Sequence, residues 1–262
     1  MPTYSSDQSS ITDFPPNPDY GSGCFRRRIR LTGTAGQVVA ELEDNCHGFR
    51  ATLSHDGHHI TAVNAETLRI PFNTCAGSIA PIQALVGVAV GSDPKTVNAA
   101  INPFSNCTHL FDLSVLAIAH AARGDTTRIY DVVVDDERDG QPANAIAYLD
   151  EKEVLRFKTR EWELLDPPEL LGKPLFRGFA AWANDYFQGD EREAAFVLQK
   201  GYFVSSARRI DSRKIEGSRG TDHPHIPGAC HTYSEGIIEQ AVRLVDTVRD
   251  FTDCPEQLLR FK

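Results

Sequence analysis

The chain has 262 residues, of which 41% are hydrophobic and 24% charged, so it is long enough to bury a substantial core and has the composition of a globular protein. Its net charge of −9 argues against a surface for nucleic acid or for an acidic membrane. No apolar run has the length needed to span a bilayer. The N-terminal residues do not show the basic segment followed by an apolar one that is typical of a secretory signal.

The six cysteines show no paired spacing and do not resemble a disulfide framework. Without a secretory signal, we expect them to be reduced thiols in a cytoplasmic protein. Residues 1–23 are rich in Ser, Pro and Asp, which predicts a flexible N-terminal arm. Residues 24–262 are expected to form a single domain.

The first third of that domain predicts strands. In the run RRRIRLT the side chains alternate, so Arg26, Arg28 and Arg30 share one face of a strand. The run HDG, ending at Gly57, predicts a tight hairpin turn because glycine accepts a positive φ. Four strands are predicted over residues 26–32, 37–43, 49–53 and 60–68. Their short connections predict an antiparallel meander.

Helical and strand patterns then alternate along the chain. Helices are predicted over 78–86, 94–100 and 106–122, strands over 128–134, 143–149 and 154–159, and helices over 179–187, 191–208 and 235–248. This order predicts the α+β class, with antiparallel meanders alternating with helical segments in one compact domain. It is also compatible with two β-then-α halves, 24–124 and 125–250, although no residue-level repeat supports a duplication.

The run NCTHLFD opens the best helical pattern and holds the main candidate chemistry. Asn106 is a suitable N-cap, which would place Cys107 and His109 in the first turn, where free backbone amides and the helix dipole favour an anion. His109 and Asp112 are three residues apart, so the carboxylate can orient the imidazole as a general base.

Cys107 is a less favoured candidate. If it lies inside the helix, its side chain diverges from that of His109 by roughly 160°, at 100° per residue. A nucleophilic Cys107 would then need a base from another part of the chain. The alternative for the whole cluster is structural, with Cys107 buried and His109 a satisfied core histidine.

A late loop carries His223, His225, Cys230 and His231, but this spacing matches no standard zinc pattern and we expect no metal site. Tyr233 follows directly and is a candidate acid or hydrogen-bond donor, its alternative role being packing at a helix start.

Arginines are candidate ligands for an anionic group. A guanidinium pairs with a carboxylate through two hydrogen bonds, so Arg28 or Arg50 can clamp an acidic substrate. The alternative is a solvated strand face with acidic neighbours. His47 lies three residues before Arg50 and joins it as a candidate for substrate binding, together with Cys107 and His231.

Nucleotide-binding loops are absent from the sequence, which has no GxGxxG, no Walker sequence and no GxSxG elbow. A cofactor-dependent dehydrogenase, a kinase or an α/β-hydrolase is therefore disfavoured, and no cofactor is expected.

The runs RRRIRL, AELED, FRATLSHDG, ITAVNAETLRIPFNTCAG and NCTHLFDLSVLAIAHAARG, followed by RIYDVVVDD, ACHTYSEG and VRDF, resemble the bacterial domain-of-unknown-function family DUF2889 over about residues 24–251. The most specific of these motifs are residues 71–75 and residues 107–110.

The resemblance implies an enzyme of aromatic catabolism. It suggests a cofactor-independent lyase that removes formaldehyde from a lignin-derived aromatic dimer and gives a stilbene. His109 oriented by Asp112 would be the base, Tyr233 the acid, and Arg28 or Arg50 the group that stabilises phenolate or carboxylate. Two alternatives remain: a hydrolase or thioesterase on an aromatic acyl compound, and a non-catalytic binding or assembly protein. The expected partner is a small aromatic substrate, and a homodimer is compatible with the chain.

Overall fold

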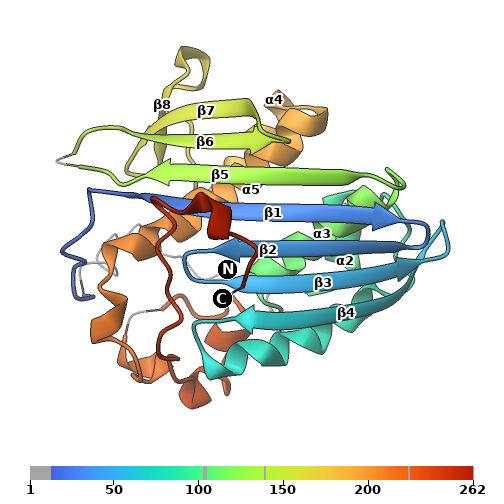
Figure 1. Cartoon of the computed structure of the whole chain (residues 1–262), viewed down its shortest axis with the longest axis horizontal. Helices are drawn as coiled ribbons and strands as arrows, with labels where there is room; N and C mark the ends of the chain where they lie inside the picture. Colours follow the sequence, from blue (N-terminus) through green and yellow to red (C-terminus); the bar gives the residue numbers. More distant parts are fainter. Residues whose placement is uncertain (1–12, 103–104, 139, 224, 262) are drawn as a thin grey trace.

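An eight-stranded antiparallel sheet organises the chain (Figure 1). The structure is a computed structural model that describes residues 13–102, 105–138, 140–223 and 225–261. Its strands are β1 (Cys24–Thr34), β2 (Gln37–Asp44), β3 (Gly48–His55), β4 (Ile60–Arg69), β5 (Thr127–Asp135), β6 (Ala143–Leu149), β7 (Lys152–Arg160) and β8 (Glu163–Asp166). The order across the sheet is β4-β3-β2-β1-β5-β6-β7-β8, so two meanders meet where β1 pairs with β5.

The helices are few and mostly short. The α-helices are α2 (Pro94–Ala100), α3 (Thr108–Ala121), α4 (Phe179–Tyr186) and α5 (Gly189–Ser205). The 3-10 helices are η1 (Asn73–Ile79), η2 (Pro81–Leu85), η4 (Pro168–Leu170), η5 (Ser206–Arg209), η6 (Ser212–Lys214), η7 (Gly220–Asp222), η8 (His231–Tyr233), η9 (Ile238–Gln240) and η10 (Pro255–Gln257). The predicted α+β class with its two meanders is confirmed.

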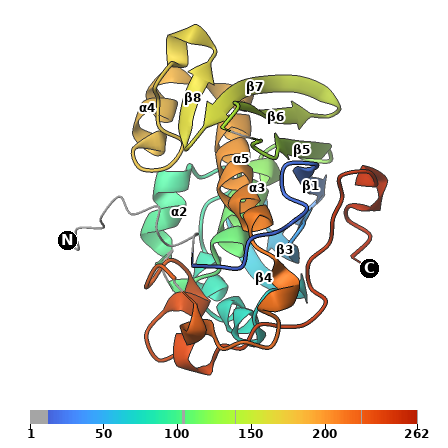
Figure 2. The same cartoon turned by 90° about the vertical axis from the view of Figure 1, so that its left-hand side faces the viewer.

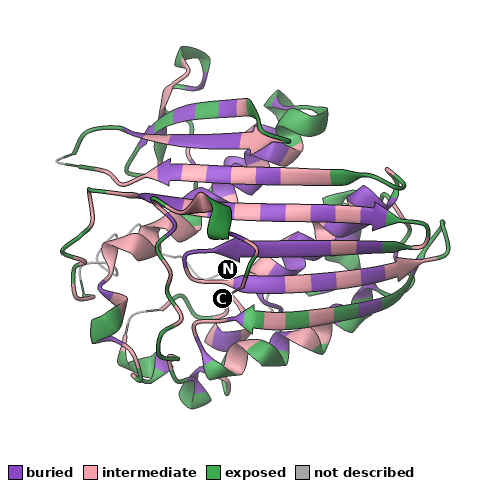
Figure 3. Ribbon diagram, viewed as in Figure 1, coloured by how far each residue is buried: buried purple, intermediate pink, exposed green. Residues whose placement is uncertain are grey.

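Alternation along the strands divides the sheet into two unlike faces (Figure 3). In β1, Phe25, Arg27, Ile29 and Leu31 are buried, whereas the residues that alternate with them, such as Arg28, are half-buried. Because successive side chains in a strand point to opposite faces, one face of the sheet is apolar and needs cover. Two helices supply it: α3 packs on β1, β2 and β3, and α5 packs on β1, β5, β6 and β7. Figure 2 shows both helices on one side of the sheet and the C-terminal segment on the other.

The outer face carries charged pairs in place of helices. Arg28 donates to both oxygens of Asp131, at 2.7 and 3.1 Å, and Arg50 contacts Glu41 and Glu66. Near the end of β2 the C-terminal segment crosses this face, where the Glu43 carboxylate accepts backbone hydrogen bonds from residues 259 and 261.

Two predicted helices differ from the structure. The helix predicted over 78–86 is replaced by η1 and η2, which meet at Pro81, a residue without a backbone N–H to continue a helix. The helix predicted over 235–248 is wrong, because η9 is the only helical part of that segment and the chain then extends, pairing Phe72 with Arg243. With α3 and α5 already on the apolar face, the segment has no surface on which to bury a helical stripe, and Val242, Val245 and Val248 stay exposed.

The N-terminal segment has contacts within the described residues. Pro16 forms a bridge with Ile210, and the backbone N–H of Asn17 donates to Arg209, so this part of the predicted arm lies against the segment after α5. Residues 1–12 of the predicted arm lie outside the described residues. Among the described residues, no helix combines the length and the apolar character that crossing a membrane requires.

Close packing of α5 on the sheet gives a stability prediction. A Cβ atom at Gly201 would lie 2.7 Å from Cγ1 of Val132 and 3.6 Å from Cε1 of Phe25. Gly201→Ala should therefore lower the free energy of unfolding by about 1–2 kcal/mol, measured by chemical denaturation, although alanine is the better helix former. Ala181→Gly, at an exposed position of α4, is the control and should also destabilise. A Gly201→Ala protein that is more stable than wild type would contradict the close packing.

Candidate functional site

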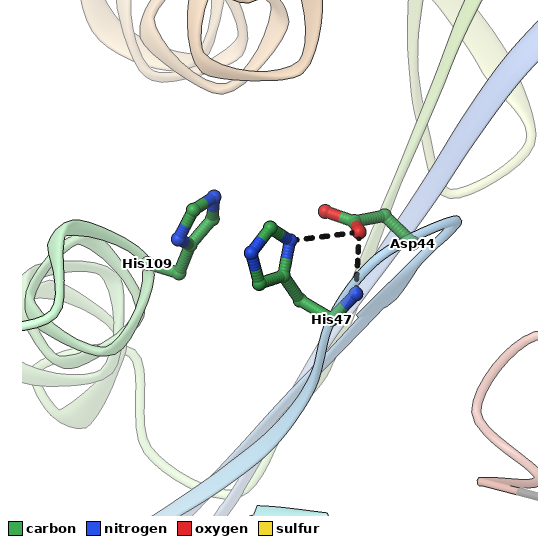
Figure 4. A group of neighbouring side chains, drawn as sticks. All are labelled: Asp44, His47 and His109. Carbon is green, nitrogen blue, oxygen red and sulfur yellow. Dashed lines mark hydrogen bonds and ion pairs between the residues drawn. The ribbon is translucent and has the colours of Figure 1, made fainter. Parts of the chain in front are cut away.

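The turn between β2 and β3 carries the central carboxylate of the site. Asp44 is fully buried, and its Oδ1 accepts hydrogen bonds from the backbone N–H groups of Cys46 and His47, both at 2.8 Å. The same oxygen lies 3.0 Å from Nδ1 of His47 (Figure 4). Because an ionised carboxylate only accepts, Nδ1 of His47 carries a proton and its Nε2 is left as the acceptor. The turn thus fixes both the orientation and the tautomer of His47.

Two buried arginines hold this turn in place. Arg27, the cross-strand neighbour of Asp44, donates from Nε and Nη2 to its Oδ2, at 3.0 and 2.6 Å. Arg69, at the end of β4, donates to the backbone carbonyls of Asn45, Asp44 and His47. One arginine therefore binds the side chain of the turn and the other binds its main chain.

The charge on Asp44 is kept despite its burial. Burial by itself would raise the pKa of this carboxyl, but His47 and Arg27 hold it well below its usual range. The carboxylate is therefore ionised at neutral pH and accepts the hydrogen bond from Nδ1 of His47.

His109 completes the site from the first turn of α3. Its ring stacks on that of His47, with centroids 3.9 Å apart and planes 27° apart, and Phe49 lies beyond, 6.2 Å from the His109 centroid. Figure 4 shows His109 directed from its helix toward His47, with Asp44 on the far side of His47. Burial, aided by the nearby charges of His47 and Arg27, lowers the pKa of His109 well below its usual range. His109 is therefore a neutral imidazole at neutral pH.

Cys107 lies closer to His109 than the sequence predicted. The helix begins at Thr108, and Cys107 is its N-cap residue, with φ −66° and ψ 124°. The prediction of Asn106 as N-cap is therefore wrong. The predicted divergence between the side chains of Cys107 and His109 is wrong as well, because helical spacing does not apply to a residue with extended backbone. Sγ of Cys107 lies 3.8 Å from Nδ1 of His109. Burial raises the pKa of Cys107, so it is a neutral thiol.

Asp112 has a different partner from the one expected. Its carboxylate lies 3.3 Å from Nζ of Lys200 and links α3 to α5 on a half-exposed surface. The carboxylate hydrogen-bonded to an imidazole in this site is that of Asp44.

The two arginines predicted to bind substrate lie elsewhere. Arg28 and Arg50 are on the outer face of the sheet, opposite the face that carries Phe49 and is covered by α3, and both are engaged with carboxylates. The structure therefore does not bring them together with His109.

The predicted residues of the late loop lie next to the N-terminus of α3. The backbone N–H of His231, in η8, donates to the carbonyl of Asn106 at 3.0 Å. Tyr233 packs edge-on against Phe72, with centroids 5.8 Å apart. Burial raises the pKa of Tyr233, while the positive charge of Arg243 opposes that shift, so the phenol is protonated at neutral pH.

The site contains groups of the types that bind metal ions. The ligand atoms of Asp44, His47 and His109 all lie within 4.8 Å of one another, whereas the late-loop histidines form no such group among the described residues. However, Oδ1 of Asp44 already accepts three hydrogen bonds and Oδ2 accepts two from a buried guanidinium. A cation would have to displace these donors and would add a positive charge beside Arg27. The set fits proton transfer better than metal binding.

Two residues of the site, Arg27 and Asp44, were not among the predicted site residues. A signal for them is present in the alternation of the strands, since both occupy positions on the apolar face, in register with each other. A charged residue in a row of inward apolar ones needs a buried partner.

A family model described as "Protein of unknown function (DUF2889)" matches residues 28–123, which confirms the predicted resemblance over that range. The matched range includes the turn that carries Asp44 and His47 and the α3 helix. It also includes the two most specific motifs of the resemblance, residues 71–75 and 107–110. No curated protein matches the chain.

The low pKa of His109 predicts how stability depends on pH. In the unfolded chain His109 titrates near pH 6.5, so below that pH the unfolded state binds a proton that the folded state does not. The free energy of unfolding should therefore fall between about pH 7.5 and about pH 5.5, and this fall should be smaller in His109→Gln. Chemical denaturation at both pH values measures this change in the free energy of unfolding. His58→Gln, in the exposed hairpin, is the control and should leave the change as it is in wild type. An unchanged pH dependence in His109→Gln would contradict the assignment.

Proposed function

We propose that the protein is a cofactor-independent acid/base lyase that cleaves a carbon–carbon bond of a small, lignin-derived aromatic dimer, releasing formaldehyde and giving a stilbene. The observation that carries the proposal is the Asp44–His47 pair stacked on His109, a fixed base beside a second, neutral imidazole. The family resemblance supplies the reaction class, and the site supplies groups that suit it.

The reaction needs proton transfer at two places. Protonation of the benzylic ether oxygen, assisted by the phenolate of the substrate, opens the ether to a quinone methide. A base then takes the proton of the side-chain hydroxyl, the carbon–carbon bond breaks, and formaldehyde leaves. The bonding electrons form the new double bond and restore the phenolate, so no electron acceptor is required.

His47 is suited to the role of general base. Its Nδ1–H is held by Asp44, which leaves Nε2 to accept a proton and stabilises the imidazolium that results. The side chain is 12% exposed, so most of it is shielded from competing water. His109, neutral and in contact with His47, is positioned to hydrogen-bond the substrate or pass on its proton.

Tyr233 is the proposed acid for the ether oxygen, because a phenol with a raised pKa is protonated and can donate. Its helix η8 is joined to the start of α3 by the hydrogen bond between His231 and Asn106. We place the reaction in the cytoplasm, where thiols stay reduced; all six cysteines are free in the structure.

Replacement of the base tests the proposal. His47→Gln should lower turnover of an aromatic dimer by about 10²–10⁴-fold, because the positioned base is lost while the amide keeps a similar shape. His109→Gln should also lower turnover strongly. Mass spectrometry of the stilbene product and a parallel formaldehyde assay give the measurement, with Asp112→Asn as a milder control since that carboxylate pairs with Lys200.

Two outcomes would reject these roles. One is normal turnover by both histidine variants with unchanged melting curves. The other is wild-type activity that disappears with a chelator and returns with a divalent cation, which would favour metal binding by Asp44, His47 and His109.

A hydrolase or thioesterase is the second candidate, because Cys107 contacts His109 through Sγ and Nδ1. The raised pKa of Cys107 argues against it, since a thiolate is the nucleophile in such enzymes. We expect Cys107→Ser to keep lyase turnover within about tenfold of wild type, whereas losing a catalytic nucleophile costs several orders of magnitude. Hydrolysis of aromatic thioesters by wild type that iodoacetamide abolishes would favour the second candidate.

A further inference from the structure

A groove of about 390 Å³ lies where the β2–β3 turn meets the segments 207–216 and 243–250. This is within the size range of small-molecule sites. From the turn it is lined by Asn45 and Cys46, the residue before His47, although His47 and His109 are not themselves among its described lining residues. The groove therefore reaches Cys46, which directly precedes the proposed base in the chain.

Several charges at this groove are already compensated, and the carboxylates of Glu216 and Asp246 also line it. Arg208 donates to Asp136 and contacts Asp250, and Arg213 contacts Asp211. Arg208 and Arg213 therefore cannot recruit an anion from solution without breaking an ion pair.

Arg243 is the exception. No carboxylate lies within ion-pair distance of it among the described residues, and its Nε is buried there without a hydrogen-bond partner. The guanidinium carbon lies 4.5 Å from the ring centroid of Phe72, so stacking fixes the plane of the group. The hydroxyl of Tyr233 also interacts with this guanidinium, which leaves the positive charge of Arg243 without a carboxylate partner beside the groove.

We propose that this groove binds the carboxylate of a small aromatic acid, with Arg243 as its counter-charge. A planar guanidinium held by stacking presents parallel N–H donors to a carboxylate. Pro71, Ile215 and Leu244 line the same groove and offer apolar contact for the ring. The inference rests on the proposed function only in identifying this ligand as substrate; it adds that the substrate is an acid and moves the anion-binding role from Arg28 and Arg50 to Arg243.

Calorimetric titration of the full chain tests the proposal with two probes, 4-hydroxybenzoate and its neutral isostere 4-hydroxybenzamide. The acid should bind wild type about tenfold or more tightly than the amide. Arg243→Gln should remove this preference, Arg243→Lys should keep part of it, and Arg156→Gln should leave it unchanged. Arg156 is a suitable control because it pairs with Glu153 on an exposed part of β7.

A second measurement needs no variant. Titration with 4-hydroxybenzoate should shift the Nε–H resonance of Arg243 in the NMR spectrum, and the amide should not. Equal affinity for the two probes, or an unmoved Arg243 resonance at saturation, would overturn the proposal.

His47→Gln should keep the probe affinity while losing turnover; if it keeps both, the lyase assignment fails and the groove assignment stands.

Discussion

The candidate site depends on a buried ion pair between Arg27 and Asp44. Each occupies an inward position at the end of an otherwise apolar sheet face, and neither is more than 2% exposed. Removing one partner would leave an uncompensated charge in the core and lower the free energy of unfolding by about 3–5 kcal/mol. Each of the two residues therefore requires the other. Asp44 then closes the turn with three further hydrogen bonds, and the orientation of His47 follows from that turn.

The sheet determines where this pair meets a second imidazole. Because β1, β2 and β3 turn their apolar side toward α3, the first turn of that helix lies over the end of β2 and the start of β3. His109 is the second residue of the helix, so it reaches His47, while Lys200 of α5 holds the next exposed position, Asp112. Helix packing and the Arg27–Asp44 pair thus act together: one supplies His109 and the other holds His47 against it.

The sequence was sufficient for the parts of the fold that depend on local pattern. Strand alternation, the turn at Gly57 and the long pattern of α3 each describe a segment that a neighbouring layer covers, and those segments form as predicted. The segment 235–248 also has apolar residues at helical spacing, but the sheet face was already occupied by α3 and α5, so Val242 and Val245 remained exposed and no α-helix formed. Local pattern cannot show which of several amphipathic segments packs on the apolar face of the sheet.

The site was predicted in part for the same reason. His109, His47, Cys107 and Tyr233 were chosen by residue type, and the turn and helix ends place the first three together. Their partners could not be chosen in that way, because Asp112 and Asp44 are both carboxylates and only tertiary pairing assigns one to Lys200 and the other to His47. One residue changed the geometry of the cluster: since α3 begins at Thr108, Cys107 turns back toward His109.

Charge pairing also separates structural arginines from a ligand-binding one. Arg28 and Arg50 have the residue type that binds a carboxylate, but adjacent strands already provide carboxylates at hydrogen-bond distance, so a substrate would have to displace an intramolecular partner. Arg243 has the same chemistry with an aromatic ring beneath it and an unused buried donor. Charge pairing selects the arginine beside the groove, because a carboxylate ligand can bind Arg243 without displacing a carboxylate of the protein.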